Sequence, residues 1–128
     1  MSGLVQVFLH INFHTRENEP WITQARESEL LPFWGKLLLE LDCKLIQGGA
    51  APDHAHLLIQ ISHEFSIQEL IRRLKGASSH WIHRRWPELK DSGWQIGYAA
   101  FSVDPKALKR VARYIQGQRE HHGYCEPK

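Results

Sequence analysis

Cysteine is scarce in this chain of 128 residues, which contains only Cys43 and Cys125. Two thiols so far apart, without a CxxC spacing, indicate neither a disulfide scaffold nor a zinc ribbon. No apolar run approaches the roughly 18 residues of a membrane-spanning helix. The first residues lack a basic region followed by an apolar block, so we expect no secretory signal. These absences predict a cytoplasmic protein that does not depend on a membrane.

Excess charge is small as well, because the formal net charge is only +2. Its distribution is more informative than its sum. Residues 70–87 and 106–119 each contain five Lys or Arg and no acid, whereas residues 17–42 contain six acids. This segregation is a modest indication of phosphate binding, although two solvated helix faces would produce the same pattern.

Hydrophobic periodicity predicts strands that alternate with helices. Residues 4–14 alternate apolar and polar side chains, as in a strand with one buried face. Ser66 and Glu69 match a capping box at the start of a helix that Pro87 ends. Asp104, followed by a proline, begins the last helix. The expected strands are 4–14, 43–47, 54–61 and 94–103, the expected turn is 48–53, and the expected helices are 29–41, 67–86 and 105–120.

This order of elements predicts an α+β fold. Two βαβ-like units form a ferredoxin-like split β-α-β sheet of four antiparallel strands, with an added C-terminal helix. We expect one domain over residues 1–128, with a break in its second helix at Gly76.

The first candidate site is a pair of histidines in the expected strand 54–61. His54 and His56 project from one face of that strand, while Ala55 and Leu57 point toward the core. Two neighbouring imidazoles on a rigid strand make half of a metal site. Partly buried histidines with backbone partners would give the same motif, so the pair alone does not decide between the two.

The second candidate is a tyrosine with a glutamine one helical turn later. Tyr114 and Gln118 are four residues apart in the last helix, so they lie on one face. On its own, such a pair is as well explained by an exposed helix surface. Gly117 inside a helix costs about 1 kcal/mol relative to alanine, so it indicates either a close approach of another backbone or phosphate, or fraying.

The third candidate is the second helix, where basic side chains, hydroxyls and Trp81 occur together. This mixture suits a phosphate track with a stacking aromatic side chain. A core Trp81 beneath a solvated basic face explains it equally well. The candidate DNA-binding residues are Arg72, Arg73, Lys75, Ser78, Ser79, Arg84 and Arg85.

Together, these motifs resemble those of the single-tyrosine HUH transposases, small insertion-sequence enzymes whose relatives are associated with repetitive extragenic palindromes. The matching segments are residues 52–58, 74–79, 94–98 and 114–118, the last followed by His121 and His122. They occur in the order of the family and span nearly the whole chain.

The resemblance implies cleavage and rejoining of single-stranded, hairpin-bearing DNA through a 5′-phosphotyrosine on Tyr114. It implies that His54, His56 and Gln118 hold a divalent metal ion, magnesium or manganese, which neutralises charge at the scissile phosphate. No nucleotide cofactor is expected, because the covalent bond stores the phosphodiester energy. The resemblance also implies a homodimer, for which the strand 4–14 offers an edge.

Two other functions remain open. The chain would also fit a catalytically inactive, domesticated module that only binds hairpin DNA. It would also fit a metal-dependent phosphoesterase that activates water, with Tyr114 merely packed. A covalent adduct between protein and DNA distinguishes the transposase from both.

Overall fold

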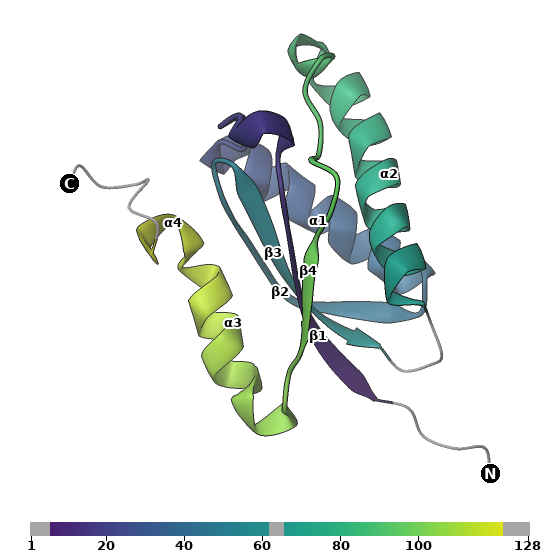
Figure 1. The fold of residues 1–128 in the computed structure, drawn as a ribbon, viewed down its shortest axis with the longest axis vertical. Coiled ribbons are helices and arrows are strands. Elements are labelled where there is room, and N and C mark those ends of the chain that lie inside the picture. The colour runs from purple at the N-terminus through teal and green to yellow at the C-terminus, as the bar shows by residue number, and fades with distance from the viewer. Residues whose placement is uncertain (1–5, 62–65, 122–128) are drawn as a thin grey trace.

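The computed structural model describes residues 6–61 and 66–121, and Figure 1 shows the path of the chain. The strands are β1 (Val7–His14), β2 (Cys43–Ala51), β3 (His54–Ile61) and β4 (Ala99–Ser102). The helices are α1 (Gln24–Glu40), α2 (Ile67–Arg85), α3 (Leu108–Gln116) and α4 (Gln118–His121), and short 3-10 turns lie at Arg16–Asn18, Pro87–Leu89 and Pro105–Ala107. Residues 4 and 5 of the first expected strand, His122 and Cys125 lie outside the described residues.

The strands form one sheet in the order β2-β3-β1-β4, with each neighbouring pair antiparallel. This confirms the predicted α+β class, a ferredoxin-like four-stranded sheet with an added C-terminal helix. β1 pairs with β3 along its whole length and with β4 on its other side. The prediction that this strand offers an edge to a second chain is therefore wrong.

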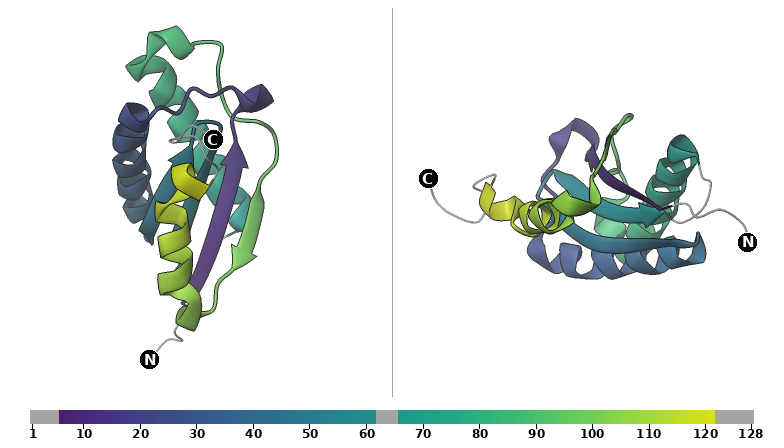
Figure 2. Two further views of the ribbon diagram at one scale, coloured as in Figure 1. Left: turned by 90° about the vertical axis from the view of Figure 1, so that its left-hand side faces the viewer. Right: turned by 90° about the horizontal axis from the view of Figure 1, so that it is seen from below.

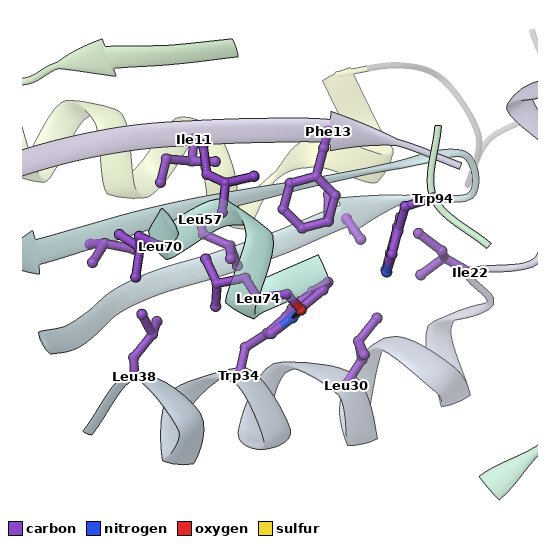
Figure 3. Close-up of a cluster of buried hydrophobic side chains, with 14 of the residues drawn as sticks. Ile11, Phe13, Ile22, Leu30, Trp34, Leu38, Leu57, Leu70, Leu74 and Trp94 are labelled. Atoms are coloured by element: carbon purple, nitrogen blue, oxygen red, sulfur yellow. Dashed lines mark hydrogen bonds between the residues drawn. The ribbon is translucent and has the colours of Figure 1, made fainter. Parts of the chain in front are cut away.

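The main core lies between one face of the sheet and the helices α1 and α2 (Figure 3). Alternate residues of β3, from Ala55 to Ile61, belong to it. Trp34 and Leu74 are fully buried, and the Trp34 Nε1–H donates to the Leu74 carbonyl oxygen over 3.2 Å. α3 contacts β2 and β3 and covers the opposite face, with α2 behind the sheet (Figure 2). The sheet thus separates a hydrophobic layer from a layer that contains α3.

The expected last helix, 105–120, begins with a 3-10 turn and is divided at Gly117 into α3 and α4. Other bounds differ as well. α1 begins at Gln24 because the Thr23 hydroxyl oxygen accepts from the Arg26 N–H over 3.1 Å and caps the helix. β2 continues through the expected turn as far as Ala51. α2 passes through Gly76 without the expected break.

The fourth strand is much shorter than expected, since Trp94 forms only an isolated bridge to Thr15 and β4 begins at Ala99. Gly97 between them has a φ of +101°, which favours glycine and interrupts the strand. Lys75 holds this segment, because its Nζ donates to the carbonyl oxygens of Gln95 and Gly97 over 2.7 and 3.0 Å.

Two further observations concern the described residues. No helix there has both the length and the apolar character needed to cross a bilayer. Cys43 is buried as a free thiol.

Candidate active site

Small residues in β2 allow α3 to lie directly on the sheet. Gly49 lies opposite His56 in the register of β2 and β3. A Cβ atom added to Gly49 would stand 2.0 Å from the carbonyl oxygen of Ile115, whose side chain is fully buried. The backbone of α3 therefore occupies the space that a larger residue would need. This approach brings Tyr114 and Gln118 onto the face from which His54 and His56 project.

The two histidines of β3 face α3 and are each 6% exposed, with ring centroids 5.0 Å apart. His54 Nδ1 lies 2.7 Å from Asp53 Oδ1. A carboxylate accepts this bond, which places the proton of the neutral ring on Nδ1 and its lone pair on Nε2. His54 Nε2 in turn lies 3.4 Å from Gln118 Oε1.

Gln118 is fully buried, and its Nε2 donates to the carbonyl oxygen of Tyr114 over 3.3 Å. Its Oε1 therefore faces the lone pair of His54, so two acceptors converge and a cation between them would be favourable. Among the described residues no three His, Cys, Asp or Glu side chains cluster as metal ligands. A site built from two imidazoles and one amide oxygen fits manganese well and magnesium less well.

The phenol of Tyr114 lies beside the imidazoles of the same chain. Its ring centroid is 6.0 Å from that of His56 and 6.4 Å from that of His10, both edge-on. Tyr114 is 41% exposed. The structure therefore brings the proposed nucleophile, both histidines and Gln118 together within one protomer and leaves the phenol accessible to a large substrate.

His10, a neighbour that sequence reasoning did not assign, also belongs to this cluster. Its Nε2 lies 2.7 Å from His56 Nδ1. Burial lowers the pKa of His10 from its ordinary value, because the charged ring loses hydration, and this favours the neutral imidazole at neutral pH. His10, Asn12 and His14 alternate with the core residues of β1, which was the available signal for their shared face.

Arg119 anchors α4, and with it Gln118, to the first helix. Its Nε donates to Glu27 Oε1 over 2.9 Å, and another guanidinium N–H donates to the Ile22 carbonyl oxygen over 2.7 Å. Glu27 also accepts from the Ala50 backbone N–H over 3.2 Å. A single partly buried carboxylate thus connects α1, α4 and β2 next to the site.

Replacing Arg119 with alanine is expected to lower the free energy of unfolding by about 1–3 kcal/mol, because Glu27 loses its charged partner in a partly buried position. Urea denaturation measures this difference. Arg84→Ala, an exposed position on α2, is the matched control and is expected to change stability by less than about 0.5 kcal/mol. Equal midpoints for the two variants would contradict the anchoring role.

Ser78 was expected to contact DNA but is fully buried. Its hydroxyl donates to the Leu74 carbonyl oxygen over 2.6 Å and accepts from Trp94 Nε1–H over 3.0 Å. The hydroxyl therefore satisfies a core tryptophan and has no surface for DNA. Its predicted DNA contact is wrong.

α2, which carries the other basic candidates, lies across the sheet from α3 (Figure 2). Arg72 pairs with Glu69 over 2.6 Å, and Arg85 pairs with Glu29 over 2.8 Å. Lys75 is occupied with backbone carbonyl groups, as described above. The remaining candidates Arg73 and Arg84 are exposed, and Ser79 is partly exposed. The structure does not bring this group together with the tyrosine.

Basic residues that sequence reasoning counted but did not assign lie on the tyrosine helix itself. Lys109, Arg110 and Arg113 are exposed on α3. Arg110 precedes Tyr114 by four residues and therefore shares its face. α3 therefore carries exposed positive charge on the same face as Tyr114.

Comparison with known proteins gives a family and related folds. Residues 4–118 match the family model described as "Transposase IS200 like". The ISDra2 transposase TnpA of Deinococcus radiodurans is 28% identical over 74 residues, which cover 54% of this chain and 53% of that relative. The matched region is thus about half the length of this curated relative.

Two solved structures share the fold. A candidate transposase of Deinococcus radiodurans R1 superposes with a TM-score of 0.77 and 20% identity, covering 92% of this chain and 95% of that one. A REP-associated tyrosine transposase bound to a REP hairpin superposes with a TM-score of 0.71 and 14% identity, covering 97% of this chain and 73% of that one. Because the family model covers most of the sequence, the chain belongs to the IS200-like transposase family.

Proposed function

We propose that this protein cleaves and rejoins single-stranded, hairpin-bearing DNA with Tyr114 as nucleophile. The observation that carries the proposal is the accessible phenol beside His56, next to the converging acceptors His54 Nε2 and Gln118 Oε1. The relative bound to a REP hairpin supports hairpin DNA as the substrate class. Family membership supports the reaction class.

In the proposed reaction the Tyr114 oxygen forms a bond to phosphorus, and the bond from phosphorus to the 3′ oxygen breaks. The phenol proton leaves, and the departing strand ends in a 3′-hydroxyl. Attack of a 3′-hydroxyl on the phosphotyrosine reverses the exchange and joins strands without a nucleotide cofactor. Exposure of Tyr114 allows the backbone of a single strand to reach it.

We propose that His54, His56 and Gln118 hold a divalent ion, manganese or magnesium. When bound, this ion polarises the scissile phosphate and neutralises the developing charge. Asp53 orients His54 through its Nδ1 hydrogen bond, and burial of Gln118 excludes water from the amide. A homodimer stays a prediction, and the geometry described here needs no residue from a partner.

The decisive experiment mixes the protein with labelled hairpin DNA and Mn²⁺ and separates the products on a denaturing gel. We expect a covalent adduct that carries the 3′-labelled fragment, and a released fragment with an extendable 3′-hydroxyl. EDTA is expected to remove both. Cleavage without an adduct would favour a phosphoesterase, and binding without cleavage under either ion would favour the inactive hairpin-binding module.

Arg110 is expected to contact the DNA backbone near Tyr114. For Arg110→Ala, the slope of log affinity against log salt for single-stranded DNA should become shallower by about 0.7, the value for one phosphate contact. Fluorescence anisotropy over a potassium chloride series measures this slope. Arg84→Ala tests the α2 face in parallel, and a larger change for that variant would place the phosphate track there instead.

A further inference from the structure

Both histidines of the motif make a hydrogen bond through the same ring nitrogen. His54 Nδ1 lies 2.7 Å from Asp53 Oδ1, and His56 Nδ1 lies 2.7 Å from His10 Nε2. A neutral imidazole carries one proton, so a proton held on Nδ1 leaves the lone pair on Nε2. The two partners come from different parts of the chain: Asp53 precedes β3, and His10 belongs to β1.

We propose that His10 is a positioning residue: it accepts the Nδ1 proton of His56 and thereby fixes the tautomer and ring orientation in which His56 Nε2 binds the metal ion. This inference rests on the metal site proposed above. It assigns to His10 the role for His56 that Asp53 has for His54. Partners of this kind commonly change metal affinity by about 10–100-fold when they are removed.

The direction of the hydrogen bond decides whether His56 can be a ligand. If His10 donated from Nε2, the proton of His56 would lie on its own Nε2 and would block metal binding there. If His10 accepts, both histidines of the motif present the same nitrogen. The ring centroids of His10 and His56 lie 5.0 Å apart, so the two rings are in contact and the bond also limits rotation of His56.

The fold explains why His10 occupies this place. β1 is antiparallel to β3, with Asn12 opposite His56 and His14 opposite His54. His10 is therefore the diagonal neighbour of His56 on the face covered by α3. His14 lies on the same strand, directly opposite His54. It contacts His54 by ring stacking, with 4.9 Å between the ring centroids.

Titration of metal-free protein with Mn²⁺, followed by the electron paramagnetic resonance of the unbound ion, tests the proposal without DNA or activity. His10→Phe is expected to weaken Mn²⁺ binding by about 10–100-fold. His10→Gln, whose amide oxygen can accept the same proton, is expected to recover most of the lost affinity. His14→Phe is the matched control, with the same substitution on the same strand, and is expected to retain wild-type affinity.

The tautomer itself provides a second readout that a purely structural role would not change. In metal-free protein, long-range proton–nitrogen correlation spectra are expected to show His56 protonated on Nδ1, with a shift toward Nε2 protonation in His10→Phe. This measurement stays informative for His10→Gln if His10→Phe does not fold, because the glutamine variant should keep the Nδ1 proton.

Failure of the inference is distinguishable from failure of the metal site. If wild-type protein binds Mn²⁺, His54→Ala does not, and His10→Phe binds as tightly as wild type, His10 has no positioning role while the proposed site stands. If His56 of the wild-type protein is protonated on Nε2, the inference is also overturned. If the wild-type protein binds no Mn²⁺, the metal site and the inference fail together.

Discussion

Tyr114→Phe is expected to abolish the covalent adduct and to leave the fold intact. Phenylalanine keeps the ring that contacts His10 and His56 and removes only the hydroxyl oxygen that would attack phosphorus. Tyr114 is 41% exposed and the variant keeps its ring, so we expect the free energy of unfolding to change by about 0.5 kcal/mol, as for an ordinary surface substitution. Binding of hairpin DNA should persist, so the loss is confined to chemistry.

Tyr98→Phe is the matched control, because Tyr98 is 46% exposed and its substitution removes the same atom. Adduct formation by this variant should equal that of the wild type. Peptide mapping of the wild-type adduct should identify Tyr114. An adduct that persists in Tyr114→Phe and disappears in Tyr98→Phe would reassign the nucleophile. Strand cleavage that continues without any adduct would point to activated water.

Gly49→Ala is expected to be the most damaging single substitution outside the reacting groups. The added Cβ would stand 2.0 Å from the Ile115 carbonyl oxygen, so the backbone of α3 must move away from β2. Overpacking of this kind costs about 1–3 kcal/mol. A displacement of about 1 Å at a reacting group can slow a reaction by about 100-fold. We therefore expect adduct formation to fall by about two orders of magnitude while most of the stability is retained.

Gly48→Ala provides the control at the adjacent position. Its added Cβ would meet the end of the flexible Leu31 side chain at 2.6 Å, on the core side of β2, and not the backbone of α3. This side chain can change rotamer, so adduct formation should stay near that of the wild type. The rate is measured by quenched reactions with excess protein. Wild-type rates in Gly49→Ala would show that the close approach of α3 is not required.

Much of the fold follows from periodicity in the sequence. β3 has the predicted bounds, and the alternation of β1 and β3 assigned one face of each to the core. The predicted turn at 48–53 was wrong over residues 48–51, because a run of small residues is typical of a turn when only the local sequence is considered. In the fold these small residues extend β2, and Gly49 among them makes room for α3. The reason for them is a tertiary contact, which local pattern does not contain.

In the candidate site, too, local spacing predicted some contacts, and others depend on the fold. Spacing placed His54 with His56 because they share one strand. It placed Tyr114 with Gln118 because they are one helical turn apart, and they stay in contact although Gly117 separates α3 from α4. His10 could not be assigned in this way, since its contact with His56 depends on the pairing of β1 with β3 over 46 positions of sequence. The basic residues were assigned to α2 by composition, and only the fold shows that α2 lies across the sheet from Tyr114. The spacing of Arg110 and Tyr114 already offered an alternative on α3.

The division of the sheet into two layers bears on how such a gene decays. Leu74, Trp34 and the rest of the main core lie on one side, while Tyr114 and the imidazoles lie on the other. A chain that loses catalysis by substitution at the tyrosine therefore keeps what holds it together. We expect substitutions at the tyrosine to leave the chain folded, so that loss of the reacting group and loss of the fold are separate events.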